Sequence, residues 1–127
     1  IFNEDMVFAA RAIENGYKIA YKAEAIVIHS HDYTPLQLLQ RNFDLGVSQA
    51  CYPKIFERVK SESEGIRLVK KTAKYLILER KTLKIAELVI KSGCKYIGYQ
   101  LGKHYRRLPK SLVMRLTMNS KYWGGEK

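Results

Sequence analysis

The chain opens with a helical pattern of apolar residues. They recur at i, i+3, i+4 and i+7, at Met6, Ala9, Ala10 and Ile13. Gly16 follows as a stop signal, and Asn3 stands where an N-cap is expected. The pattern predicts a helix that begins at Glu4 and ends before Gly16.

The two stretches that follow have the pattern of β-strands. Residues 17–22 alternate tyrosine or isoleucine with lysine or alanine, which suits a half-buried strand. Residues 25–31 form a β-branched run that ends in His29 and His31, and a period of two places both histidines on one face. We predict two short strands at the edge of a sheet.

The remaining residues are predicted to be helical. Residues 34–37 read as a capping box with proline at the first helical position, and an apolar stripe follows as far as Ala50. Further helices are expected from residue 61 and over residues 82–105, where glycines allow another backbone to come close. The buried face of the second of these helices is expected to hold Ala86, Ile90, Gly93, Ile97 and Leu101. The fold class is therefore α+β, predominantly α, divided into residues 1–50 and a basic amphipathic helical region, residues 51–127.

Charge separates these two regions. Residues 1–50 have a net charge of −2, whereas residues 51–127 have a net charge of +13. Tyrosines mix with cations over residues 95–110, and Tyr122 and Trp123 follow, a combination that suits the headgroups of an anionic membrane. A basic helical adaptor without catalysis that binds membrane or nucleic acid is the alternative, although no nucleic-acid-binding module is recognisable and we expect no nucleic acid partner.

Two groups of residues are candidates for chemistry. Glu4 and Asp5 lie in the first turn of the first helix, where the helix dipole favours an ionised carboxylate that can accept a proton from a hydroxyl. Acids are also common in first turns without any such role. His29 and His31 could reach one metal ion or one phosphate, or could simply be polar residues at a strand end.

The chain resembles a known family over most of its length. The residues that carry the resemblance are Glu4-Asp5-Met6-Val7-Phe8, Arg11, Gly16-Tyr17-Lys18-Ile19, Tyr21, Ala25, His29-Ser30-His31, Tyr33, Gln37 and Arg41-Asn42-Phe43-Asp44-Leu45-Gly46. They are similar to the C-terminal part of the catalytic domain of inverting family 2 glycosyltransferases, which have the GT-A fold. The bacterial rhamnosyltransferases of surface polysaccharide synthesis are the most similar branch.

This resemblance implies roles for several residues. Asp5 would be the general base, and Glu4 would orient the site. His29, with His31 as a weaker candidate, would help to bind a divalent cation, Mg²⁺ or Mn²⁺. The main ligands of that cation are expected in an N-terminal half that supplies an Asp-x-Asp motif, which this sequence lacks. Substrate contacts are expected from Arg11, Gln37 and Arg41, although Arg41 could equally be a solvated helix residue.

The same resemblance predicts partners and location. The donor would be a nucleotide sugar such as dTDP-rhamnose, and the acceptor a saccharide or a lipid-linked saccharide at the anionic inner face of the cell membrane. We expect a cytoplasmic, peripheral enzyme whose C-terminal portion alone is inactive. Exposed apolar surface at an unpaired sheet edge would also favour a homo-oligomer.

Overall fold

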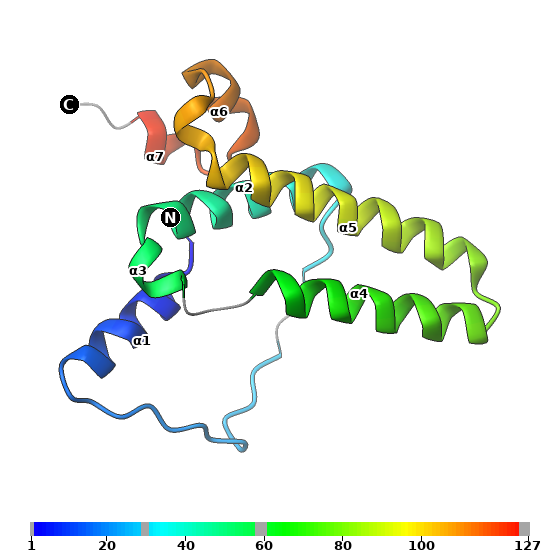
Figure 1. The fold of residues 1–127 in the computed structure, drawn as a ribbon, viewed down its shortest axis with the longest axis horizontal. Coiled ribbons are helices and arrows are strands. Elements are labelled where there is room, and N and C mark those ends of the chain that lie inside the picture. The colour runs from blue at the N-terminus through cyan, green and yellow to red at the C-terminus, as the bar shows by residue number, and fades with distance from the viewer. Residues whose placement is uncertain (1, 29–30, 58–60, 125–127) are drawn as a thin grey trace.

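A computed structural model describes residues 2–28, 31–57 and 61–124 (Figure 1). The elements in chain order are α1 (Glu4–Glu14), α2 (Pro35–Cys51), α3 (Pro53–Phe56), α4 (Ser61–Leu78), α5 (Thr82–Lys103), the 3₁₀ helix η1 (Tyr105–Arg107), α6 (Lys110–Leu116) and α7 (Ser120–Gly124). The prediction of a predominantly helical chain is confirmed.

Helix α2 begins with the predicted capping box. The Thr34 hydroxyl accepts a hydrogen bond from the Gln37 backbone N–H at 3.3 Å, and the Gln37 side chain accepts one from the Thr34 backbone N–H at 2.9 Å. Pro35 occupies the first helical position, where no backbone donor is needed. Local sequence therefore fixes the start of the helix on which the rest of the fold is built.

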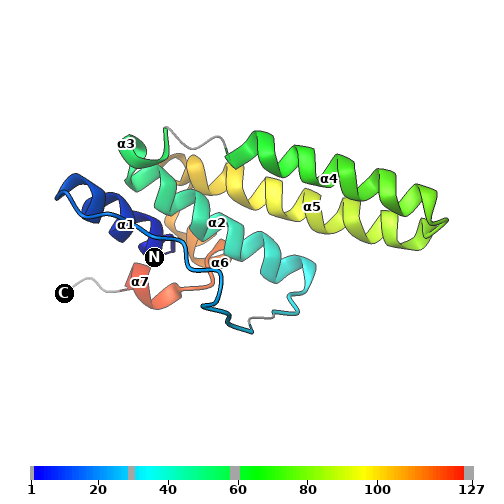
Figure 2. The ribbon, with the colours of Figure 1, turned by 90° about the horizontal axis from the view of Figure 1, so that it is seen from below.

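Helices α2 and α5 touch backbone to backbone through glycines. A Cβ atom at Gly98 would overlap the Leu39 carbonyl, and one at Gly102 would overlap the Phe43 carbonyl. From the first contact to the second, the residue number rises by four in each helix, so the two helices run in the same direction. Figure 2 shows them side by side. Because only glycine leaves room for this approach, the Gly-x-x-x-Gly spacing in α5 is a packing motif here.

Helices α4 and α5 form an antiparallel hairpin that extends away from the other elements (Figure 1). The turn between them contains Arg80, whose φ of 53° is in the left-handed region that closes many helices. Val69, Thr72 and Leu76 are half-buried and recur at i, i+3 and i+7, which places them on one side of α4.

The predicted buried face of α5 is only partly right, because Leu101 packs on the core but two isoleucines of that face are exposed. That face comprised Ala86, Ile90, Gly93, Ile97 and Leu101, yet Ile90 is 56% exposed and Ile97 is 52% exposed. The contact with α2 uses the neighbouring face that holds Gly98 and Gly102 instead. The side of α5 that packs on α2 is the side where glycines let the two backbones come close, and the apolar pattern does not predict it.

The core lies where α2 meets the C-terminal elements. Phe43, Val47 and Val113 are almost fully buried. Partly buried apolar residues surround them, namely Leu101, Tyr105, Leu108, Leu116 and Trp123. Gln40 adds a polar tie, because its Nε2 donates to the Arg115 carbonyl at 3.0 Å.

A buried carboxylate also holds the C-terminal elements to α2. Asp44 is 0% exposed; the Thr117 hydroxyl donates to its Oδ1 at 2.6 Å, and the Met118 backbone N–H donates to its Oδ2 at 2.9 Å. Burial raises the pKa of the Asp44 carboxyl above its ordinary value, and these hydrogen bonds oppose the rise in part.

The raised pKa of Asp44 predicts a pH-dependent stability. The folded state holds the Asp44 proton more tightly than the unfolded state does, so the free energy of unfolding falls as pH rises from the ordinary pKa through the raised one. Urea unfolding from about pH 4 to about pH 7 should show this fall in the parent protein relative to Asp44→Asn, which cannot titrate. A parent-minus-variant difference that stays constant or grows with pH would contradict the assignment.

The two predicted strands are not formed. Residues 17–28 lie outside the helices and are exposed throughout, with Ile28 at 101% and Tyr21 at 92%. A strand needs a neighbouring strand for its backbone hydrogen bonds, and the described residues contain none. Because residues 29 and 30 lie outside the described residues, the end of the second predicted strand is not described.

Candidate functional site

One face of α2 receives the start of the chain. The Ser48 hydroxyl donates a hydrogen bond to the Phe2 carbonyl, and the Asn3 side-chain amide donates to the Leu45 carbonyl at 3.4 Å. Arg41, Leu45 and Ser48 are spaced i, i+4 and i+7, so all three lie on one side of the helix. The two residues that precede α1 are therefore attached to α2 by contacts that are distant in sequence.

Arg41 is held between two aromatic rings on that face. Its guanidinium carbon lies 5.1 Å from the centre of the Phe2 ring and 5.5 Å from that of Tyr33, and its Nη1 donates to the Tyr33 hydroxyl at 3.4 Å. The side chain is half-buried and makes no ion pair with any carboxylate in the described ranges. Such an oriented guanidinium is suited to binding a phosphate or a carboxylate.

His31 joins this group through Tyr33. The two rings stack with centroids 4.9 Å apart and an interplanar angle of 23°. His31, predicted to bind a metal, and Arg41, predicted to bind substrate, thus both contact the ring of Tyr33. We name Phe2, His31, Tyr33 and Arg41 the arginine cluster.

Glu4 and Asp5 are exposed in the first turn of α1, next to this cluster in sequence. Asp5 Oδ1 accepts a hydrogen bond from the Met6 backbone N–H at 2.8 Å, which orients the carboxylate at the helix start. The predicted N-cap is only partly right. Asn3 occupies that position with φ 63°, but its side chain makes no capping bond and donates to α2 instead. The capping group was diverted to attach α1 to α2.

A comparison with curated proteins finds relatives over 124 residues, which is 97% of this chain. O-antigen chain rhamnosyltransferase WbaN of Salmonella anatum is 45% identical, and O-antigen chain rhamnosyltransferase RfbN of Salmonella typhimurium strain LT2 is 43% identical. This chain is homologous to O-antigen chain rhamnosyltransferases. The predicted resemblance to bacterial rhamnosyltransferases is thereby confirmed.

The match covers only part of these rhamnosyltransferases. The chain spans 39% of the length of each. No protein-family model matches the chain, and no solved structure does.

The structure does not join the other predicted site residues to the arginine cluster. Arg11 is exposed in the last turn of α1, where its carbonyl accepts from the Asn15 side chain at 2.8 Å. The Gln37 side-chain oxygen is engaged in the capping box of α2. His29 lies outside the described residues. Substrate contacts by Arg11 and Gln37 stay predictions.

The described part of the chain also lacks two features. It contains no group of three or more His, Cys, Asp or Glu side chains placed to hold a metal ion. None of its helices combines the length and the apolar character needed to cross a bilayer.

Sequence reasoning missed Phe2 and Tyr33 as members of the site. Phe2 reaches Arg41 from 39 positions away along the chain. No periodicity connects such a pair. The only signal was the aromatic type of each residue beside a candidate, since Phe2 precedes the acidic pair and Tyr33 follows His31 by two.

Proposed function

We propose that this chain forms part of an inverting glycosyltransferase that moves rhamnose from a nucleotide-linked donor to a saccharide or lipid-linked acceptor. The names of the relatives support the sugar and the class of acceptor. The observation that carries the proposal is the attachment of Phe2 and Asn3 to α2, which supports a site shared by Arg41 and the acidic residues that follow Asn3.

Each of these residues has a task in the proposed reaction. Asp5 accepts the proton of an acceptor hydroxyl while that oxygen bonds to the anomeric carbon of the donor. The bond from that carbon to the nucleotide diphosphate breaks on the opposite face, so one displacement inverts the configuration. Arg41 offsets the negative charge of the departing diphosphate, and Glu4 orients the acceptor.

The resemblance implies a divalent cation, but the steps proposed for Asp5, Arg41 and Glu4 do not involve one. When bound, Mg²⁺ or Mn²⁺ would neutralise charge on the diphosphate. The described residues offer no complete ligand set. The cation, its expected main ligands outside this chain, and the contributions of His29 and His31 therefore stay predictions.

We place the reaction at the inner face of the cell membrane, where a lipid-linked acceptor would be found. The basic C-terminal region, with its net charge of +13, supports contact with anionic lipids. Pairing of two copies stays a prediction.

Donor binding by Arg41 variants tests the proposal. In the active enzyme, Arg41→Gln should weaken binding of the nucleotide-rhamnose donor by about 10- to 100-fold, because a charge-assisted contact with the diphosphate is lost. The donor affinity of Arg41→Lys should lie between those of the parent and of Arg41→Gln, since an ammonium keeps the charge without the planar geometry of the guanidinium. Isothermal titration calorimetry measures both.

Arg67→Gln is the matched control for this measurement. Arg67 lies on α4 in an exposed ion pair with Glu64 at 2.9 Å, so its removal should leave donor affinity unchanged. An Arg41→Gln enzyme that binds donor as tightly as the parent would remove Arg41 from the site.

A further inference from the structure

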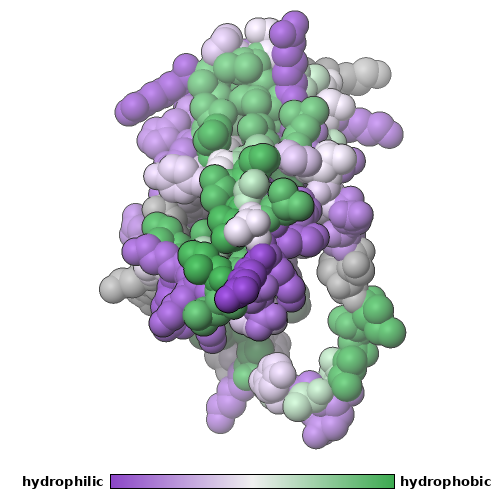
Figure 3. Space-filling view, turned by 90° about the vertical axis from the view of Figure 1, so that its right-hand side faces the viewer, coloured by the Kyte–Doolittle hydropathy of each residue, from purple (hydrophilic) through white to green (hydrophobic). Residues whose placement is uncertain are grey.

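The hairpin of α4 and α5 carries apolar side chains that no described residue covers. Those on its flanks are each between 52% and 63% exposed, namely Ile66, Tyr75, Ile77, Val89, Ile90, Tyr96 and Ile97. Soluble proteins rarely leave so many large apolar groups together on one element. Figure 3 views the molecule from the hairpin end and shows hydrophobic side chains as a band between hydrophilic ones.

The exposed apolar residues of α5 form two neighbouring rows along the helix. Val89 and Tyr96 are seven residues apart, which is about two helical turns, and Ile90 and Ile97 repeat that spacing beside them. Val89 and Tyr96 point to the side of α5 opposite Gly98, where α2 packs. The row of Val89 and Tyr96, here called the apolar strip, therefore faces away from α2.

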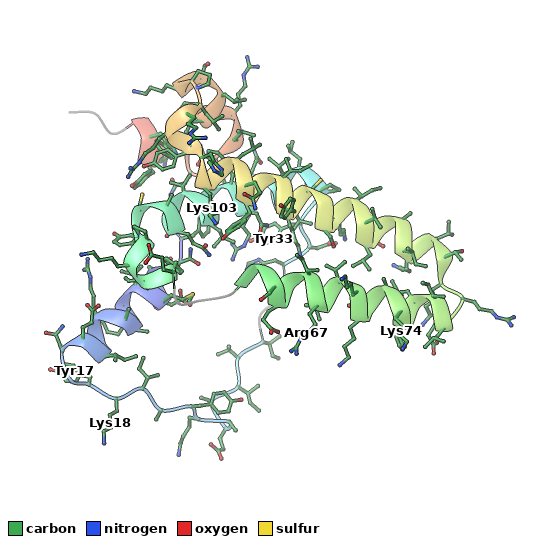
Figure 4. All side chains as sticks on the ribbon, viewed as in Figure 1. Tyr17, Lys18, Tyr33, Arg67, Lys74 and Lys103 are labelled. Carbon is green, nitrogen blue, oxygen red and sulfur yellow. The ribbon has the colours of Figure 1, made fainter. Side chains whose placement is uncertain are left out.

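Helix α4 adds apolar residues and a row of cations. Ile66 and Ile77 are eleven residues apart, about three turns, and lie beside the face that contacts α5. Lys70 and Lys74 lie next to these isoleucines, farther from α5. Figure 4 shows Lys74 and Arg67 pointing away from α5. Neither Lys70 nor Lys74 makes an ion pair with a described carboxylate.

We propose that this hairpin lies on an anionic lipid bilayer, with the apolar strip at the boundary between headgroups and acyl chains and the lysines on lipid phosphates. The proposal deepens the membrane contact in the proposed function by naming the surface that makes it. Residues 61–103 hold ten Lys and Arg against four Glu, a balance that complements anionic headgroups. A second copy of the hairpin would bring like charges together.

This surface overlaps only in part with the stretch that the sequence indicated, because Tyr96 is the residue that the two share. Tyr105 and Trp123, two of the aromatic residues expected at the headgroups, pack instead on the core, with ring centroids 5.5 Å apart. They are thus engaged within the protein, and the exposed ring of Tyr96 on α5, beside Val89, is the better candidate.

Vesicle flotation tests the apolar part of the proposal. The active enzyme should float with vesicles of phosphatidylcholine and phosphatidylglycerol and much less with phosphatidylcholine alone. Val89→Gln/Tyr96→Gln should lower the partition coefficient at least tenfold, because two side chains lose their burial in lipid. Tyr21→Gln/Ile28→Gln is the matched control, since it removes two exposed apolar groups outside the hairpin and should float like the parent.

A charge pair tests the cationic part. Lys70→Glu/Lys74→Glu should lower the partition at least tenfold, because each lysine near an anionic surface contributes about fivefold. Lys18→Glu/Lys22→Glu changes the net charge equally on exposed residues elsewhere and should have a smaller effect. Circular dichroism checks that helix content is unchanged. Hairpin variants that float like the parent would overturn the proposal.

Two further outcomes separate this inference from its alternatives. Analytical ultracentrifugation without lipid should show the parent and the Val89→Gln/Tyr96→Gln variant in the same oligomeric state. A parent dimer that this variant converts to monomer would overturn the membrane assignment in favour of a second copy. Donor binding without vesicles tests the transferase function independently, so its loss or retention does not alter the flotation result.

Discussion

Gly102→Ala is expected to lower the free energy of unfolding by about 3 kcal/mol, near the upper end of the usual range for overpacking. The new methyl group would overlap the Phe43 carbonyl, which is part of a helix backbone and cannot move aside as a side chain can. The helices would have to separate at the place where the core is formed. Urea unfolding followed by circular dichroism measures the change.

Gly93→Ala on the same helix is the control. Apart from the neighbouring backbone of α5 itself, no atom lies within 4 Å of the Cβ position at Gly93, so the substitution should instead stabilise the protein by about 1 kcal/mol through helix propensity. Equal effects of the two substitutions, in either direction, would contradict the close contact between α2 and α5.

Asp5→Asn is expected to lower the rate of rhamnose transfer by about 10²- to 10⁴-fold, the usual contribution of a general base. The amide keeps the size of the side chain and can still accept the Met6 N–H bond, but it cannot take a proton from the acceptor. Donor affinity should stay within about twofold, because the proposed donor contact is made by Arg41. Single-turnover transfer and donor titration measure the two effects separately.

Glu14→Gln is the matched control, since it removes an exposed acid from the last turn of the same helix. It should leave transfer unchanged. Transfer by Asp5→Asn at the parent rate would exclude Asp5 as the base, whereas loss of donor binding together with transfer would indicate a structural role.

Local signals predicted the helices well. The capping box at Thr34, the start at Ser61 and the helix from Thr82 are all present, because caps and helical periodicity are encoded within a few residues. The prediction of two strands was wrong because a strand depends on contacts beyond its own sequence. Residues 17–28 have strand-like alternation, but a strand forms only beside another strand, and local sequence does not provide one.

The motif that carried much of the resemblance turns out to be largely structural. Within Arg41-Asn42-Phe43-Asp44-Leu45-Gly46, Phe43 fills the core, Asp44 binds the turn before α7, and Gly46 lies against α5. Arg41 alone projects into the arginine cluster. A family motif of this kind identifies the fold of the segment before it identifies the chemistry.

The candidate site was predictable in its parts but not in its arrangement. The resemblance implied Asp5 as the general base and Arg41 as a substrate contact, and both roles stay predictions. The attachment of Phe2 and Asn3 to α2 depends on the hydrogen bonds from Asn3 and Ser48, which join positions more than forty residues apart. Such contacts follow from the tertiary fold, and no spacing rule in the sequence contains them.

The most direct test of the central claim is the mass of the acceptor after reaction. The active enzyme is incubated with nucleotide-linked rhamnose and a lipid-linked saccharide, and the product is examined by mass spectrometry. We predict that the acceptor gains one rhamnose residue. An acceptor that gains no rhamnose, while another nucleotide sugar donates its sugar to it, would contradict the account.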